Sequence, residues 1–274
     1  DTYAGANGLE VKPVRMRNGV FDGDFASVIS DGSVTAVAVQ NPDFFGCLAD
    51  MREIAETVHA KGCHFIYVVT EPMSLGLLKS PGDCGADIVC GEAGSFGNPQ
   101  GFGGPGLGLL AAKEQFLRKM PGRLAGKTKD ADGNDAYVLT LQTREQHIRR
   151  EKATSNICSN EALCALRAVI YLSLVGNRIR QLAELNHRLA SYLATELSGK
   201  GIVPLFSAPF FNEFTVKVPS AGKVRAAIKK KGILFGVDPG RWYPEYSDCV
   251  ILACTECNTP EQIDQLIECL RAEI

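Results

Sequence analysis

The chain has 274 residues and a net charge of −2, with 45% hydrophobic and 22% charged residues. These values are typical of a globular protein with one large domain, or with a large and a small one. They disfavour a general binder of nucleic acids or anionic membranes, which needs a positive excess, and no continuous apolar run approaches the length of a membrane span.

The first ninety residues alternate between apolar runs and amphipathic stretches. Residues 35–40 and 64–69 are continuous apolar runs, which predict buried strands. Residues 47–60 predict a helix between them, which Gly62 ends. The helical spacing is set by Leu48, Met51, Ile54, Ala55 and Val58. Strand, helix and strand in this order predict a parallel βαβ unit. Two further short strands are expected at 87–90 and 107–112.

The middle of the chain predicts a hairpin and two helices. Asp132-Gly133 lies inside the turn-rich segment 126–140 and predicts a surface hairpin. Residues 159–176 are apolar on nearly every side, which indicates a helix buried in a core or at an interface. An amphipathic helix is expected over 178–198, after the break at Gly176-Asn177.

Beyond Gly199, strand-like runs alternate with helical patterns, which predicts a smaller α/β domain. The strands are expected at 211–218 and 248–254, and the helices at 223–231 and 260–272. We therefore divide the chain into a large domain over 1–177, a connecting helix over 178–199 and a small C-terminal domain over 200–274.

Ten cysteines are scattered along the chain without the spacing of a disulfide framework. Free thiols and a reducing, cytoplasmic location are therefore expected. Cys249, Cys254 and Cys257 match a C-x4-C-x2-C spacing that iron–sulfur clusters use. Cys249 and Cys254 would face opposite sides of a strand, however, which favours ordinary buried thiols, and we expect no metal. His59, His64 and His187 have no carboxylate or nucleophile nearby in the sequence, which disfavours a hydrolase triad.

The loop over 91–108 contains eight glycines and two prolines. Such density permits close approach of the backbone to a ligand or to another chain. Gly101, Gly103 and Gly106 fit the dinucleotide pattern G-x-G-x-x-G, but a predicted strand follows them where that pattern requires a helix. A tight turn packed under the sheet is the plainer interpretation.

Residues 140–160 form the most polar and donor-rich segment of the chain. Five basic or potentially basic residues fall within nine positions: Arg144, His147, Arg149, Arg150 and Lys152. Thr154, Ser155 and Asn156 follow just before the predicted apolar helix. Hydroxyls before a helix N-terminus suit a phosphate. A helix cap beside a solvated basic face is an equally good interpretation.

Several stretches together resemble the first subunit of the glycine-cleaving P-protein family. They are QNPDFFG at 40–46, the glycine-rich loop at 91–108, PGR at 121–123 and the segment 139–160, whose QTREQHIRREKATSNICSN is long and unusual. The closing stretches FNEFTVKVP and LACTECNTPEQIDQL also resemble the family's C-terminal domain. The resemblance covers essentially the whole chain and begins well inside the family's usual sequence, so we expect an N-terminal portion of the family to be missing here.

The resemblance implies a fold-type-I architecture of enzymes that use pyridoxal phosphate (PLP). This is an α/β fold with a mainly parallel sheet in a large domain and a smaller C-terminal domain. The family decarboxylates glycine on PLP and passes the aminomethyl group to the lipoyl arm of the H-protein. It further implies a second P-protein subunit as partner in a heterotetramer, and neither nucleic acid nor membrane as a partner.

The resemblance also shows where this sequence departs from a self-sufficient PLP enzyme. In the family's second subunit, the Schiff-base lysine stands five residues before the proline that leads into the glycine-rich loop. Counting back from Pro99 gives Gly94, and no lysine occurs between Lys79 and Lys113. The strand that should end in the acid for the pyridine nitrogen has only Glu71 nearby. A glycine cannot form an imine, so this chain is expected to leave the lysine to its partner.

The resemblance implies that this chain acts in trans, by contributing groups to the cofactor site of its partner subunit. Fold-type-I dimers build each site at the interface, where the neighbouring chain often supplies a hydroxyl to the cofactor phosphate. Thr154, Ser155 and Asn156 stand about where that donor is expected. Arg144, His147, Arg150 and Lys152 are expected to order this loop or to meet the substrates.

Two alternatives remain open at this point. The chain is either an enzyme subunit or a scaffold or regulatory domain that keeps the fold without contributing to catalysis. A self-contained PLP enzyme would need a lysine elsewhere, such as Lys113 or Lys127.

Overall fold

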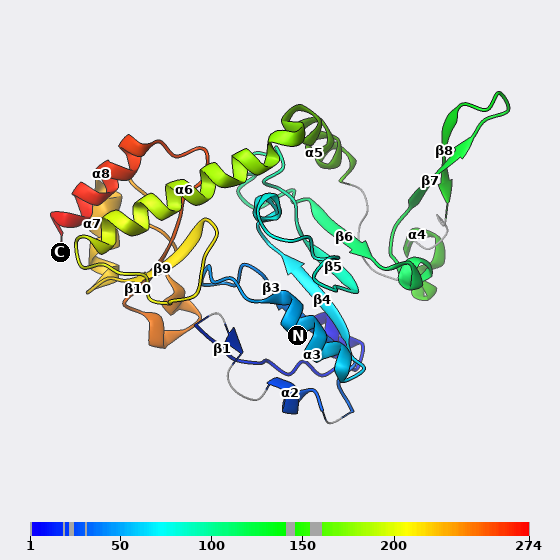
Figure 1. The fold of residues 1–274 in the computed structure, drawn as a ribbon, viewed down its shortest axis with the longest axis horizontal. Coiled ribbons are helices and arrows are strands. Elements are labelled where there is room, and N and C mark those ends of the chain that lie inside the picture. Colours follow the sequence, from blue (N-terminus) through cyan, green and yellow to red (C-terminus); the bar gives the residue numbers. More distant parts are fainter. Residues whose placement is uncertain are drawn as a thin grey trace.

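The computed structural model describes residues 2–18, 20–21, 25–30, 32–140, 146–153 and 161–273. A four-stranded sheet lies at its centre (Figure 1). The C-terminal unit, with α7, α8 and a two-stranded sheet, lies on one side of this sheet, and a β-hairpin projects on the other. The long helix α6 runs from the top of the sheet into the C-terminal unit.

The central sheet has the strand order β3–β4–β5–β6. Its strands are β3 (Ala36–Gln40), β4 (His64–Val69), β5 (Ile88–Glu92) and β6 (Gly108–Ala112). The first three run parallel, and β6 is antiparallel to β5. Helix α3 (Met51–Ala60) connects β3 to β4, which confirms the predicted βαβ unit.

Helix α3 begins four residues later than the sequence pattern indicated. Asp50 caps it, because its side chain accepts hydrogen bonds from the backbone N–H groups of Arg52 and Glu53. Leu48 therefore precedes the helix and packs against the cluster formed by Met73, Ala183 and Phe211. The apolar face of α3 lies against the sheet, with Met51, Ile54, Ala55 and Val58 buried.

The C-terminal unit pairs β9 (Glu213–Lys217) with β10 (Cys249–Ala253) in antiparallel register. Helices α7 (Ala221–Lys230) and α8 (Pro260–Arg271) complete it. Thr259 starts α8 through a capping box with Gln262. Its apolar core includes buried side chains from each of these elements and from the C-terminal half of α6 (Ile179–Ser198).

Helix α6 also reaches the large unit. Ala183, near its N-terminal end, packs with Met73 and Phe211. A Cβ on Gly76 would lie 2.8 Å from the Ala183 Cβ and 2.9 Å from the Ile179 carbonyl oxygen. A glycine is therefore needed at position 76 for α6 to approach this closely.

Helix α5 (Ala162–Val175) is not buried in the core of the described chain. The sequence pattern indicated burial either in a core or at an interface, and the first of these is wrong. Only Cys164 and Ala168 are buried, whereas Leu163 is 68% exposed and Leu174 is 72% exposed. The stretch Ala162–Ser198 is long and apolar enough to cross a membrane by length and composition. That is weak support for a span, because its second half buries its apolar face in the protein. At 14 residues, α5 alone is about 21 Å long, shorter than a bilayer core.

The projecting hairpin consists of β7 (Leu124–Lys129) and β8 (Asp135–Thr140), as predicted from its turn. Asp130 orders the turn by accepting hydrogen bonds from the backbone N–H groups of Asp132 and Asn134. Tyr137 on β8 is 74% exposed. The other short elements are α1 (Thr2–Ala6), β1 (Met16–Arg17), β2 (Val20–Phe21), α2 (Phe25–Val28), α4 (Gln146–Arg149) and the 3-10 turns η1 (Pro72–Gly76), η2 (Glu114–Lys119), η3 (Arg150–Lys152), η4 (Gly176–Arg178), η5 (Pro239–Arg241) and η6 (Pro244–Tyr246).

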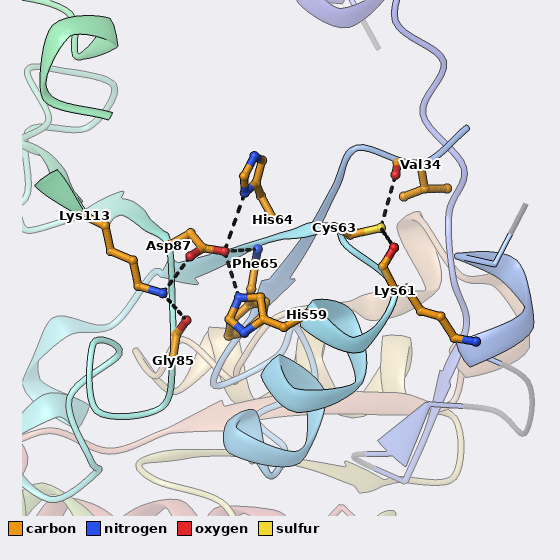
Figure 2. A network of polar contacts seen from close by, with 9 residues as sticks. All are labelled: Val34, His59, Lys61, Cys63, His64, Phe65, Gly85, Asp87 and Lys113. Carbon is orange, nitrogen blue, oxygen red and sulfur yellow. Dashed lines mark hydrogen bonds and ion pairs between the residues drawn. The ribbon is translucent and has the colours of Figure 1, made fainter. Parts of the chain in front are cut away.

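Asp87, directly before β5, joins three neighbouring elements at one end of the sheet (Figure 2). One carboxylate oxygen, Oδ2, accepts from the Phe65 N–H at 2.8 Å and lies 2.8 Å from His59 Nε2. The other, Oδ1, accepts from Lys113 Nζ at 2.7 Å. His64 Nδ1 lies 3.8 Å from Oδ2. The sequence showed no carboxylate near His59 and His64, so the fold corrects this expectation by bringing Asp87 to both.

The Asp87 side chain is 6% exposed and is charged. Burial alone would raise the pKa of Asp87, but hydrogen bonds from Lys113, Phe65 and His59 outweigh it and hold the pKa at about 2. A pKa below that of the unfolded chain means that the ionised carboxylate stabilises the fold. This contribution is complete above the unfolded pKa of 3.8 and is lost as the pH falls towards 2.

We expect Asp87→Asn to lower the free energy of unfolding by about 2 kcal/mol at neutral pH, because the shift of the Asp87 pKa corresponds to that energy. Urea denaturation of both proteins at pH 7 and at about pH 3 measures it, and the deficit should be roughly halved at the lower pH. Asp132→Asn in the exposed hairpin turn is the matched control. An equal deficit at both pH values would contradict the assigned role.

Candidate functional site

The carboxyl ends of β3, β4 and β5 meet at one edge of the central sheet because the three strands are parallel. In open α/β sheets this edge is where ligands bind. It faces α5 and the start of α6 (Figure 1). We call it the Gly94 edge, because Gly94 lies on it two residues beyond β5.

Gly91 and Gly94, at and just beyond the end of β5, differ in what a side chain at each position would contact. A Cβ on Gly91 would lie 1.7 Å from the Val69 carbonyl oxygen, so only glycine fits beside β4. A Cβ on Gly94 would meet only the Glu92 carboxylate, with its Oε1 at 2.8 Å. Glu92 Oε1 in turn accepts a hydrogen bond from the Leu107 N–H at 2.9 Å. The position that the family resemblance assigns to the lysine thus lies at this edge of the sheet and has a carboxylate beside it.

Glu71 follows β4 on the same edge and bonds to groups of its own chain. Its Oε1 accepts from the Met73 N–H at 2.9 Å and from the Ser95 hydroxyl at 3.0 Å. Burial raises the pKa of Glu71 above its usual range, although these two hydrogen bonds partly offset the effect. Ser95 is the residue after Gly94, so Glu71 ties the end of β4 to the start of the glycine-rich loop.

The QNPDFFG stretch at 40–46 joins this edge to the C-terminal unit. Gly46 has a φ of +89°, and a Cβ there would lie 2.1 Å from the Glu213 carbonyl oxygen of β9. The Thr215 hydroxyl donates to the Phe45 carbonyl at 2.9 Å. Asn41 is buried, donates to the Tyr67 hydroxyl at 2.8 Å and accepts from the Ala49 N–H. In the described chain, this stretch is therefore a close contact between the two units.

The glycine-rich loop supports α5. Gly97 has a φ of +79°, and a Cβ there would lie 2.6 Å from the Tyr171 Cβ on α5. The Asn98 side chain donates to the Cys164 carbonyl at 3.2 Å, and Phe96 stacks on Tyr171. The element after the loop is strand β6, which disfavours a dinucleotide site as the sequence indicated.

Neither lysine considered for a self-contained enzyme lies at the Gly94 edge. Lys113 bonds to Asp87 and to the Gly85 carbonyl at the opposite end of β5. Seven residues of extended chain separate that end from Gly94, roughly 20 Å. Lys127 lies on the hairpin and pairs with Asp135 at 2.8 Å.

The polar segment that follows the hairpin is described only in part. Arg144, Thr154, Ser155 and Asn156 lie outside the described residues, and only the backbone of His147 is described. Arg150 and Lys152 belong to η3 and are exposed. Figure 1 shows α4 beside the base of the hairpin and away from the carboxyl end of β4. The described part of this segment therefore lies apart from the chain's own Gly94 edge.

The cysteines with iron–sulfur-like spacing are placed separately. Cys249 is buried in β10, Cys254 is buried in the core of the C-terminal unit, and Cys257 is exposed. Burial raises the pKa of Cys254 to about 11, which keeps it a thiol at neutral pH. Cys249 and Cys254 are therefore packing residues.

Sequence patterns did not indicate a second half-buried carboxylate near the Gly94 edge. Glu213, on β9, has a pKa raised by burial and also by the charge of Glu71. Glu71 and Glu213 lie far apart in the sequence, and only the fold brings them together. A glutamate at the start of a strand whose next residues are largely buried was the one available signal.

Comparison with known proteins identifies the family. The profile described as glycine cleavage system P-protein matches residues 1–270. A probable glycine dehydrogenase (decarboxylating) subunit 1 of Desulfitobacterium hafniense is 47% identical over 270 residues, which cover 97% of this chain and 60% of that protein. A protein of the same description from Azorhizobium caulinodans is 51% identical over 244 residues, which cover 87% of this chain and 54% of that protein. The chain thus spans about three fifths of the length of such relatives.

Solved structures agree with this assignment. A crystal structure of glycine decarboxylase (P-protein), in inhibitor-bound form, superposes with a TM-score of 0.88 at 38% identity and covers 100% of this chain and 62% of that one. An aspartate aminotransferase from Thermus thermophilus has a TM-score of 0.70 at 14% identity, covers 100% of this chain and 74% of its own, and shows the fold alone. The predicted fold-type-I architecture of PLP-dependent enzymes is therefore confirmed, and the chain belongs to the glycine cleavage system P-protein family.

Proposed function

We propose that this chain is part of the P-protein subunit without a Schiff-base lysine, and that it completes the PLP site of a lysine-bearing second subunit. The observation that carries the proposal is the composition of the Gly94 edge. Glycine stands at the lysine position, and the nearby Glu71 and Glu92 bond to groups of this chain. Such an edge does not fit covalent anchoring of PLP, so this chain is not active alone.

PLP is the cofactor of the family, and when bound to a lysine it acts as an electron sink during decarboxylation. In this proposal the second subunit holds PLP and glycine is the substrate. The aminomethyl group passes to the lipoyl-bearing H-protein. The reaction then takes place in the cytoplasm.

Two exposed apolar surfaces support association with another chain or with the rest of a longer protein. The outer face of α5 exposes Leu163, Leu166, Val169 and Leu174. The hairpin exposes Tyr137, Val138 and Leu139. Several exposed apolar side chains on one element are typical of a protein contact site.

Thr154, Ser155 and Asn156 are proposed to reach the phosphate of the partner's PLP. The position of α4 supports this, since the preceding segment lies beside the hairpin and away from the chain's own Gly94 edge (Figure 1). Arg144, His147, Arg150 and Lys152 then order the loop or contact the substrates. A scaffold that keeps the fold without contacting PLP is the alternative.

The double substitution of Thr154→Ala and Ser155→Ala should weaken PLP binding by the reconstituted pair of subunits. Loss of a hydrogen bond to a charged group costs about 1.5–3 kcal/mol, or about tenfold or more in affinity. PLP titration and glycine–bicarbonate exchange measure the two effects. Thr195→Ala, at an exposed position of α6 outside the proposed contact surfaces, is the control, and unchanged PLP affinity and exchange in the double variant would favour the scaffold.

Glutamates at Leu163 and Leu174 should abolish the complex with the second subunit, because charges cannot be buried there without partners. The isolated variant should keep the thermal stability of the wild type, since both side chains are exposed. Size-exclusion chromatography of co-expressed subunits measures the complex. Val203→Glu, at another exposed apolar position, is the control, and a complex that survives the double change would contradict the proposed contact.

Borohydride reduction of this chain with PLP should give no preferred adduct at Lys113 or Lys127. Lys113 is held by Asp87, and Lys127 lies on the hairpin beside Asp135. Peptide mapping by mass spectrometry compares these lysines with exposed Lys200. A dominant adduct at Lys113 or Lys127 would show that the chain anchors PLP itself.

A further inference from the structure

The C-terminal unit contains a pocket of about 450 Å³ between α7 and the segment 234–241. This volume is within the range of small-molecule sites. Three of its lining residues are cations and one is an acid: Arg225, Lys229, Arg241 and Asp238. Neither the βαβ unit nor the Gly94 edge contributes to it.

One face of α7 forms the floor of the pocket. Gly222, Arg225, Ala226 and Lys229 line it at the i, i+3, i+4 and i+7 spacing of a single helix face. The neighbouring face of α7 is in the core, where Ala221, Val224 and Ile228 are buried. Gly222 and Ala226 are small and leave the floor open, while Arg225 and Lys229 place charges along it.

The opposite wall is fixed to the core. Gly236 has a φ of +58°, and a Cβ there would lie 2.3 Å from the Ile251 carbonyl oxygen of β10. Val237 exchanges two backbone hydrogen bonds with Ile251, at 2.9 and 3.0 Å. Asp238 caps η5 by accepting from the Gly240 N–H, which sets the position of the following Arg241. The wall is therefore formed before any ligand binds.

The charges in the pocket do not balance. Arg225 is paired, with Nη2 2.6 Å from Asp238 Oδ2. The side chains of Lys229 and Arg241 have no hydrogen bond or ion pair with the described residues, whereas the nearby Lys231 side chain pairs with Glu273. One acid faces three cations, which leaves an excess of two positive charges. A head group with two negative charges, contacted by cationic donors from two sides of the pocket, matches this excess. Arginine is well suited to binding phosphate.

We propose that this pocket binds a phosphate monoester, with the dianionic head between Lys229 and Arg241. The apolar part of the ligand lies against Leu234 and Val237, which are 86% and 48% exposed at the pocket. Arg225 is a weaker contact, because Asp238 already holds it. A carboxylate with the same apolar body has one charge fewer and binds more weakly.

Calorimetric titration of the full chain with phenyl phosphate at low ionic strength tests the proposal. Lys229→Gln and Arg241→Gln should each weaken binding by about tenfold, as expected when a charged contact is lost. Lys230→Gln, one position away and outside the lining, should leave the affinity unchanged. Ala226→Phe should also abolish binding, since it fills the floor without changing the charge. Trp242, the chain's single tryptophan, follows Arg241 and gives a fluorescence signal at the site.

Benzoate and benzyl alcohol, which carry one negative charge and none, distinguish the head group. Phenyl phosphate should bind more tightly than benzoate, and benzyl alcohol should give no measurable heat. The proposal is overturned if wild-type protein does not bind phenyl phosphate, or if benzoate binds as tightly. Equal affinities of the wild type and the Lys229 and Arg241 variants would also overturn it. Circular dichroism of each variant confirms that the fold is kept.

Discussion

The buried Asp87 carboxylate is the constraint on which the arrangement of the central sheet depends. A charge that is 6% exposed is tolerable only with several partners, and Asp87 finds them in the end of α3, the start of β4 and the residue after β6. These bonds align three strands at their common end. Because β4 and β5 are parallel, that alignment also fixes their opposite ends, where Glu71 and Gly94 lie. The network is thus structural and acts on the candidate site only through strand register.

The two ends of the sheet differ in the groups that bond to their acidic side chains. At the Asp87 end, cationic and histidine side chains hold the pKa low, and the carboxylate is ionised. At the Gly94 edge, burial raises the pKa of Glu71 and of Glu213, and the donors to Glu71 are a backbone N–H and a hydroxyl. Both donors contact the same oxygen of Glu71, Oε1, and they tie the end of β4 to the glycine-rich loop. The acids at this edge therefore bond to neutral groups of their own chain, in contrast to the cationic partners of Asp87.

Continuous apolar runs located the strands of the central sheet, but the burial expected on both faces is not seen in the described chain. In β3 and β4, buried side chains alternate with more exposed ones, so one face of these strands is buried and the other is not. The start of α3 was wrong by four residues because Asp50 capping depends on side-chain geometry that periodicity does not encode. The contact of His59 with Asp87 spans 28 positions and arises only from the parallel register. For 159–176, composition indicated burial but not what covers the helix. Gly94 was found through family resemblance alone, and the roles of Thr154, Ser155 and Asn156 stay predictions.

The glycine-rich loop connects the missing lysine to the surface proposed for association. It begins at the Gly94 edge, where Ser95 bonds to Glu71, and three residues later it supports α5 through Gly97 and Asn98. The side of α5 that faces the loop is packed, and the other side exposes leucines and valines. A chain bound to that outer face would therefore be separated from Gly94 by one helix and one short loop. Two of its glycines are required by this packing, since Gly91 lies against Val69 of β4 and Gly97 against Tyr171 of α5.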